Sequence, residues 1–394
     1  MTVPVFPSAG RQALGEWIRG RFVEINSELE DLYWEQDDRN STQPGGELQR
    51  ELLRDGEALV AELTADDLTG GDFDDRFALL GVVGMFISAV RRHEVEREDG
   101  GPNEQSPMAA AVAIQLSVSL GTAPRFLTAH NQTHNRAIDG RYSTFTSGRS
   151  ERLFTDYNTR SVFAYMRAAD ALVRAAPLGV SHPATHDLLL DAANGVQRAV
   201  ALNRELADRL DVDEFFFRVR PYLKPCQIGR SLFRGNNAGD FAAFNEIDVI
   251  LGLCSMDDPH YAQIVTEKLP FLVPAERARL KESLRAPSLL DGFMRELESA
   301  GRPWFQENGA AFVAVLDAVG EGARHHHDVI VSRFISAPTA AISEQHRERI
   351  TASGPPLEVL IASLERLRDQ RSAAQRDDVP TRHEDVQTLR SVLR

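Results

Sequence analysis

The amino-acid sequence predicts an all-α protein in which helices pack on one another around an apolar core. Apolar residues recur at helical spacing through most of the 394-residue chain, and strands and helices do not alternate regularly. Hydrophobic residues make up 42% of the chain and charged residues 26%, a balance typical of a globular protein with a sizeable core. A helical bundle is therefore expected.

Turn and loop residues divide this helical pattern into separate elements. Leu14, Ile18 and Phe22 predict a helix over 11–34, and the apolar segment 74–94 predicts a more buried helix. The polar segment 134–151 is expected to be a loop. Further helices are predicted over 108–121, 159–176, 186–210, 213–223, about 276–301 and 304–336, and, after a loop or turn, within 231–253 and 351–369.

Composition changes suggest how these helices are grouped. The segment "REDGGPNEQSP" (97–107) combines Gly, Pro and several charges, which makes it the best candidate for a linker. It predicts a small N-terminal helical domain over 1–105 and a large helical domain over 106–369. From residue 370 the chain is rich in charge, so 370–394 is expected to be a mobile tail.

Charge and hydropathy exclude several classes of partner and location. The net charge of −14 argues against broad binding to nucleic acid or to an anionic membrane, because both attract basic surfaces. No apolar run approaches the ~18 residues of a membrane-spanning helix, and the start of the chain lacks the regions of a signal peptide. Cys226 and Cys254 have no metal-binding spacing and are expected to be reduced thiols. We therefore expect a cytoplasmic protein.

Three consecutive histidines, His325, His326 and His327, lie inside the predicted helix 304–336. Consecutive residues of a helix diverge by about 100°, so the three imidazoles do not converge on one zinc ion. On a helical wheel His327 joins an apolar stripe. The stripe comprises Phe312, Leu316, Val319, Ala323, Ile330 and Phe334. His327 is therefore either a hydrogen-bonded core histidine or a single axial ligand of haem iron, and spacing alone leaves both open.

Two charged residues bear on that choice. Arg324 precedes His327 by three residues, so it is either placed to meet a haem propionate or is a solvated helix charge. Asp248 lies in the apolar helix "NEIDVILGL" and needs a partner, because an unpaired buried carboxylate is costly. Arg324 is a candidate for that partner.

Two further segments have the composition of a ligand site. In "EFFFRVRPYLKPC" (214–226), Phe216 and Arg220 share a helical face, which suits a ligand with a ring and a carboxylate, such as an aromatic amino acid. The alternative is a core helix with a structural ion pair. In "FRGNNAGDF" (233–241), Gly and Asn let the backbone approach a flat ligand closely. The alternative there is a plain turn before a helix.

Together these segments resemble the indoleamine 2,3-dioxygenase superfamily of haem enzymes. The nearer match is the branch of monodechloroaminopyrrolnitrin synthase, which rearranges chlorotryptophan in pyrrolnitrin biosynthesis. The resemblance is clearest over about 186–365. It rests on the segments "RPYLKPCQIGRSLFRGNNAGDFAAFNEIDVILG", "YAQIVTEKLPFLVPAERARL" and "RHHHDVIVSRFI".

The resemblance implies a fold and a cofactor. The fold is that of an indoleamine 2,3-dioxygenase-like helical haem domain, here 106–369, with a smaller N-terminal helical domain. The cofactor is haem b, with His327 as the ligand of its iron. Arg324 falls on the arginine that contacts a propionate, and Asp248 on the acid near it. Asn237 and Ala238 fall on small residues facing the haem.

The resemblance also implies how a substrate is held. Phe215 and Phe216 fall on an aromatic wall, and Arg220 falls on the arginine that binds the substrate carboxylate. The implied partners are an aromatic amino acid, O2 or peroxide, and an electron donor. "TASG" (351–354) resembles a mobile loop over the pocket. Phe217 and the segment 159–163 depart from the dioxygenase pattern, which favours a changed distal pocket and leaves open the substrate atom attacked.

The resemblance therefore implies a haem-dependent oxygenase or oxidative rearrangement enzyme of secondary metabolism. Its substrate would be L-tryptophan or a related indole amino acid. The alternatives are a tryptophan 2,3-dioxygenase that forms N-formylkynurenine, a non-catalytic haem-binding or sensor protein, and a helical scaffold without haem. The sequence leaves open the exact substrate, the electron donor and the oligomeric state.

Overall fold

A computed structural model describes residues 8–65, 67–94, 106–341 and 356–393. The fold is all-α, as predicted. Its contacts divide the chain into two compact units that interleave along the sequence. Unit 1 is formed by 1–156, 210–240 and 337–356, and unit 2 by 157–209, 241–336 and 357–394.

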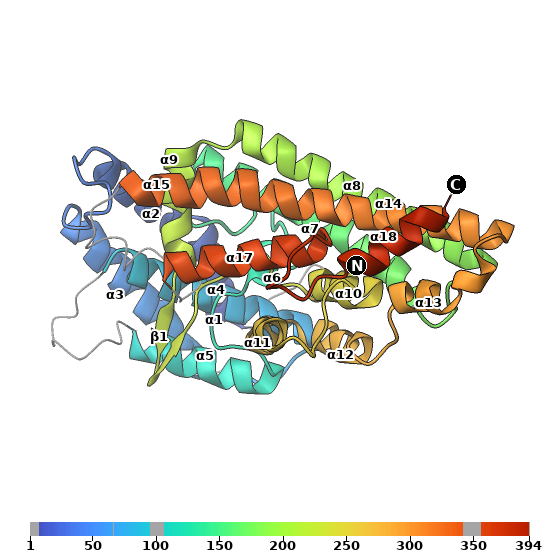
Figure 1. The fold of residues 1–394 in the computed structure, drawn as a ribbon. Coiled ribbons are helices and arrows are strands. Elements are labelled where there is room, and N and C mark those ends of the chain that lie inside the picture. The colour runs from blue at the N-terminus through green and yellow to red at the C-terminus, as the bar shows by residue number, and fades with distance from the viewer. Residues whose placement is uncertain (1–7, 66, 95–105, 342–355, 394) are drawn as a thin grey trace. The chain divides into compact units, whose positions relative to one another are not determined.

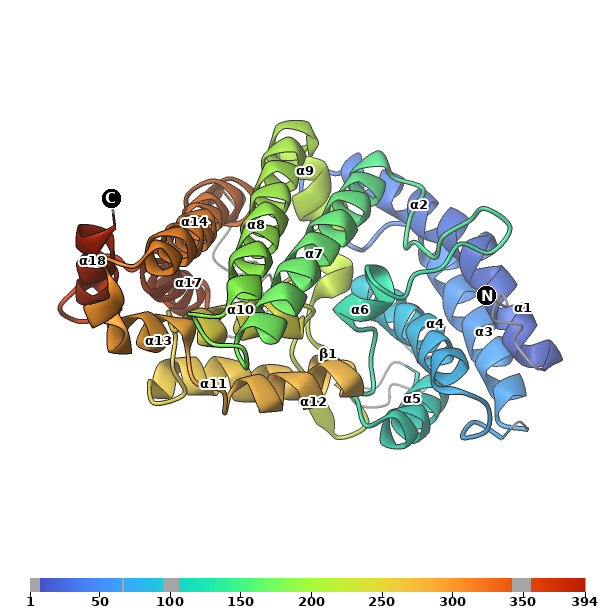
Figure 2. The same ribbon diagram turned by 90° about the vertical axis from the view of Figure 1, so that its right-hand side faces the viewer.

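Unit 1 is built around α4 (Phe73–Arg92), a helix that is buried along most of its length and packs on α1, α3, α5 and η2 (Figure 2). The other elements of unit 1 are α1 (Ala9–Arg19), α2 (Arg21–Trp34), α3 (Gly46–Leu63), α5 (Pro107–Leu120), α6 (Thr128–Asn131), the start of α7 (Arg149–Ala175), α9 (Val212–Glu214), the π-helix η1 (Phe215–Val219), the 3-10 helix η2 (Arg220–Leu223), strands β1 (Cys226–Ile228) and β2 (Ser231–Phe233), and α15 (Ala337–Ala341).

Two local features of unit 1 differ from the predicted helices. The single helix predicted over 11–34 is wrong, because Gly20 (φ −124°, ψ −105°) leaves the helical region and separates α1 from α2. The segment after Pro225 forms an antiparallel hairpin in which Cys226 pairs with Phe233. Gly229 has φ +57° in its turn, a conformation that glycine adopts without strain.

Buried polar groups of unit 1 are joined in a network beside α4. Arg92 donates to both carboxylate oxygens of Glu30, over 2.8 and 2.9 Å. The neighbouring His93 uses both ring nitrogens: Nδ1 lies 3.0 Å from the Tyr33 hydroxyl and Nε2 lies 2.7 Å from Asn26 Oδ1. Burial and the charge of Arg92 hold the pKa of His93 well below 6.5, so the ring is neutral in the folded protein.

Unit 2 is organised by α8 (Pro183–Arg209) and α14 (Pro303–His325), two long helices that lie side by side (Figures 1 and 2). Gly195 lets α8 approach α7, since a Cβ there would lie 2.9 Å from the Ala164 carbonyl oxygen. The remaining elements are α10 (Ala242–Leu251), α11 (Pro259–Lys268), η3 (Leu269–Phe271), α12 (Pro274–Ser283), α13 (Leu289–Arg295), η4 (Leu297–Ser299), the π-helix η5 (His326–Ser336), α17 (Leu357–Arg371) and α18 (His383–Val392).

The C-terminal segment corrects an expectation. A mobile charged tail was predicted over 370–394, but α18 folds there and packs against α13. Val386 and Leu389 are buried three residues apart on one face of α18, and this apolar pair holds the charged segment in the core of unit 2. The predicted linker 97–107 lies mostly outside the described residues, and the predicted domains 1–105 and 106–369 stay predictions.

None of the helices described combines the length and the apolar character that crossing a membrane requires.

We predict that acid destabilises the fold partly through His93. Because its pKa is depressed in the folded protein, the unfolded chain binds more protons as pH falls below 6.5, and stability falls by up to about 1.4 kcal/mol per pH unit. The His93→Asn variant should be less stable at pH 7.5, but should lose less further stability between pH 7.5 and 5. Urea denaturation at both pH values measures this. Equal losses in the two proteins would contradict the prediction.

Candidate functional site

The residues that the sequence singles out fall into two groups, one in each unit. Unit 1 holds Phe215, Phe216, Arg220, Asn237 and Ala238, and unit 2 holds Asp248, Arg324 and His327. The "TASG" segment, 351–354, lies outside the described residues.

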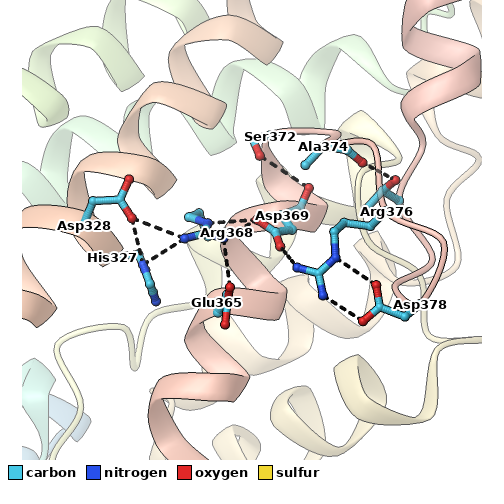
Figure 3. Close-up of polar contacts among 10 residues, drawn as sticks. His327, Asp328, Glu365, Arg368, Asp369, Ser372, Ala374, Arg376 and Asp378 are labelled. Atoms are coloured by element: carbon cyan, nitrogen blue, oxygen red, sulfur yellow. Dashed lines mark hydrogen bonds and ion pairs between the residues drawn. The ribbon is translucent and has the colours of Figure 1, made fainter.

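His327 lies near the start of the π-helix η5, just beyond the end of α14 at His325. Its Nδ1 is 2.9 Å from Asp328 Oδ1 (Figure 3). Its Nε2 is buried and has no hydrogen-bond partner among the described residues. The hydrogen bonds therefore engage one nitrogen of the ring and leave the other available.

The contact with Asp328 favours one placement of the ring proton. A carboxylate oxygen only accepts, so a distance of 2.9 Å favours a proton on His327 Nδ1, while Arg368 Nη1 lies 3.2 Å from the same nitrogen. In the neutral ring Nε2 then presents a lone pair, which is the state a metal ligand needs. His93 shows the contrast, since both of its nitrogens have partners. The geometry of His327 therefore leaves Nε2 available to a metal ion.

The two preceding histidines have different surroundings. His325 interacts electrostatically with Arg204, Asp208 and Glu321, and burial lowers its pKa. His326 is exposed, and its neighbours, among them the charge of Arg371, lower the pKa of its ring. The three side chains thus meet three different sets of neighbours.

Arg368 of α17 connects His327 to a chain of charged groups (Figure 3). Its Nη1 lies 3.3 Å from Asp328 Oδ1 and 3.2 Å from His327 Nδ1. Its Nε donates to Asp369 Oδ1 over 2.8 Å, and its Nη2 donates to Glu365 Oε1 over 3.3 Å. Sequence reasoning missed Asp328 and Arg368. Asp328 had a signal, because an acid directly follows the candidate ligand.

Asp248 has a different partner from the one expected. Its carboxylate accepts two hydrogen bonds of 2.8 Å from Arg371 and one of 3.1 Å from the Tyr261 hydroxyl. The suggestion that Arg324 pairs with Asp248 is therefore wrong. Burial alone would lower the pKa of Arg371, but the charge of Asp248 more than offsets it and raises that pKa. Arg324 is exposed and forms no hydrogen bond or ion pair with any described residue.

Arg220 is the most unusual charge of unit 1. Its side chain is 4% exposed, it forms no ion pair with a described carboxylate, and its Nη1 has no hydrogen-bond partner among the described residues. Its guanidinium carbon lies 5.2 Å from the centre of the Phe216 ring, which confirms that the two side chains share a face. Burial lowers the pKa of Arg220 to about 10.

Other cations reinforce the positive potential at η2. Burial, followed by the charges of Arg91, Arg92 and Arg220, lowers the pKa of Lys224 to about 7. Cations that lower the pKa of a neighbouring ammonium favour a bound anion, since its charge relieves their repulsion. The arrangement therefore suits a carboxylate.

The aromatic residues of this segment are packed on η1. Phe215 is buried, and its ring centre lies 4.9 Å from that of Phe154. Phe216 is 3% exposed and meets Phe217 edge to face at 5.0 Å. Both phenylalanines of the expected aromatic wall are thus buried apolar positions, and Phe216 lies against Arg220.

The Gly- and Asn-rich loop is held by an internal ion pair. Asp240 accepts from Arg234 over 2.8 and 3.0 Å and from the Asn237 backbone over 3.1 Å. Asn237 and Ala238 are exposed. The neighbouring Asn236 is buried, and neither polar atom of its side chain has a partner among the described residues. Its unsatisfied amide makes Asn236 a binding candidate that the sequence did not reveal.

Comparison with known families now identifies the class. A family model described as monodechloroaminopyrrolnitrin synthase PrnB matches residues 8–393. The chain belongs to this family. The resemblance found in the sequence is confirmed, and it extends over the N-terminal third as well.

Membership of the PrnB family indicates the general class of reaction. It indicates a haem-dependent enzyme that modifies tryptophan oxidatively, within the indoleamine 2,3-dioxygenase-like superfamily. It supports haem iron as the cofactor and an aromatic substrate and O2 as partners. The lone pair of His327 Nε2 and the unpaired guanidinium of Arg220 are the two features of this chain that suit such chemistry.

We predict that Asp248 and Arg324 differ sharply in their effect on stability. Asp248→Asn leaves the charge of Arg371 without its carboxylate and should lower the free energy of unfolding by about 3 kcal/mol. Arg324→Gln removes an exposed charge and should change it by less than about 0.5 kcal/mol. Urea denaturation of both variants measures this. Similar effects of the two substitutions would contradict the assignment of Arg371 as the partner.

Proposed function

We propose that this PrnB-family chain is a haem-dependent oxygenase or oxidative rearrangement enzyme acting on L-tryptophan or a related indole amino acid. His327 ligates the iron of haem b through Nε2 in this proposal. The observation that carries it is the buried Nε2, which lacks a partner while Asp328 holds the proton of Nδ1. When bound, the haem supplies the redox chemistry that activates O2 or peroxide.

Arg220 is proposed to bind the substrate carboxylate. A guanidinium that is 4% exposed and unpaired is costly, and a carboxylate that forms a charge-assisted pair with it offsets that cost. The guanidinium presents a planar fork of donors, which matches the two oxygens of a carboxylate and so restricts the substrate's orientation. Arg220 contributes to the lowered pKa of Lys224, and a carboxylate bound at Arg220 favours the charged form of that lysine.

Phe215 and Phe216 are proposed to form the apolar wall that receives the indole ring. Both are nearly inaccessible to solvent, so an aromatic ring placed against them is shielded from water. The Phe216 ring already lies beneath Arg220, which couples ring binding to carboxylate binding. This pairing of an aromatic face with a cation selects for an aromatic amino acid over a simple indole.

The remaining candidates are proposed to support the haem. Arg324 is exposed and uncommitted, which leaves its charge available for a propionate. Asp248 supports the haem site indirectly, because its carboxylate holds Arg371 in place. Asn237 and Ala238 are proposed to face the haem plane, where small side chains permit close approach. An electron donor and a role in secondary metabolism complete the proposal.

Product analysis distinguishes the two catalytic versions of this proposal. Incubation with L-tryptophan yields N-formylkynurenine, with two added oxygen atoms, if the enzyme is a simple dioxygenase. A different elemental formula indicates a rearrangement. Mass spectrometry of the product decides between them.

We predict that His327→Ala abolishes the spectrum of histidine-ligated haem. The full-length protein is loaded with haem and its absorption is recorded with and without added imidazole, which should restore ligation in the variant. His325→Ala is the matched control and should retain the wild-type Soret band. A wild-type spectrum in His327→Ala would refute the assignment of the ligand.

We predict that Arg220→Gln weakens the binding of L-tryptophan by about 10- to 100-fold, the loss of one charge-assisted pair of about 1.5–3 kcal/mol. Titration of the Soret shift in haem-loaded protein measures the dissociation constant. Arg218→Gln is the control, since Arg218 pairs with Asp31 instead. Tryptamine, which lacks the carboxylate, should bind wild type and Arg220→Gln with similar affinity. An unchanged affinity of Arg220→Gln for tryptophan would disprove the role.

A further inference from the structure

We propose that Asp328 and Arg368 set the reduction potential of the haem iron in opposite directions through His327. Both are positioning residues, because they act on the iron only through the imidazole. The inference rests on the proposed function in one respect, the ligation of haem by His327. It adds a pair of residues that determine how strong an electron donor the enzyme needs.

The geometry places a carboxylate and a guanidinium on the same ring nitrogen (Figure 3). Asp328 Oδ1 lies 2.9 Å from His327 Nδ1. Arg368 Nη1 lies 3.3 Å from that oxygen and 3.2 Å from the same nitrogen. Because Nδ1 carries the proton for Asp328, Arg368 does not donate to it and instead donates to the carboxylate oxygen.

The two groups have opposite electronic effects. A carboxylate that accepts the Nδ1 proton gives the imidazole partial negative character, which makes Nε2 a stronger donor and favours ferric over ferrous iron. A guanidinium bound to the same oxygen withdraws part of that charge and weakens the effect. Reduction adds one electron from a donor to the ferric iron, so the pair biases this one-electron equilibrium.

The surrounding contacts decide which effect is larger. Arg368 is shared among three carboxylates, because Asp369 lies 2.8 Å from its Nε and Glu365 lies 3.3 Å from its Nη2. Its charge is therefore largely neutralised by groups other than Asp328. Asp369 is itself held by Arg376, which donates over 2.6 Å. Asp328 is 53% exposed, so solvent screens it in part, but its hydrogen bond to the ring is direct. We expect Asp328 to have the larger effect.

The test measures the reduction potential of the haem-loaded, full-length protein by spectroelectrochemistry. Asp328→Asn should favour ferrous iron at least tenfold, a rise of about 59 mV for one electron. Arg368→Gln should shift the equilibrium the other way by about threefold. Resonance Raman of the ferrous proteins should show a weaker iron–histidine bond in Asp328→Asn and a stronger one in Arg368→Gln. A merely structural disturbance is not expected to shift the reduction potential in opposite directions in the two variants.

Asp378→Asn is the matched control, since this carboxylate pairs with Arg376 and does not contact the histidine. Its potential should equal that of wild type. If wild type shows no histidine-ligated haem, the proposed function fails and this inference fails with it. If wild type is ligated but neither Asp328→Asn nor Arg368→Gln moves the potential, the inference alone is overturned. If Asp328→Asn does not bind haem, the test rests on Arg368→Gln. A reduction potential equal to that of wild type in this variant then overturns the inference.

Discussion

The ion pair between Asp248 and Arg371 is the constraint on which the candidate haem ligand depends. It joins α10 to the end of α17 through two hydrogen bonds of 2.8 Å, with the carboxylate fully enclosed. Arg368 lies three residues before Arg371, about one turn away, so fixing the end of α17 also fixes Arg368. Arg368 in turn bonds to Asp328, which orients the ring of His327. A series of contacts thereby links this buried pair to the imidazole of His327.

Buried charged residues of this chain differ in whether they have an oppositely charged partner. Glu30 and Arg92 are buried together and satisfy each other, as Asp248 and Arg371 do. Arg220 is equally buried but lacks any carboxylate among the described residues. No described carboxylate compensates its desolvation, and the Phe216 ring is the aromatic group against its guanidinium. The same argument applies to Nε2 of His327, a buried acceptor without a donor.

The sequence predicted what depends on local spacing and missed what depends on distant partners. Helical periodicity indicated the fold class, and the four-residue spacing placed Phe216 beneath Arg220. The partner of Asp248 lies 123 residues away on another helix, and no local pattern indicates it. Asp328 was missed because the wheel ranked only apolar neighbours of His327. The break at Gly20 was missed because a single glycine is tolerated in many helices.

The helical wheel also assumed regular α-geometry, and the structure departs from it at both candidate segments. η5 begins at His326 and η1 begins at Phe215, and each forms π-helical i→i+5 hydrogen bonds. This widened turn rotates the residues that follow relative to an ideal helix, so Val331 joins Phe334 as a buried position where Ile330 was expected. π-Helices are rare because their backbone geometry is less favourable, and they occur frequently at functional sites. Here the two π-helices coincide with the imidazole nitrogen that lacks a partner and with the segment proposed to form the aromatic wall, which agrees with the proposed function.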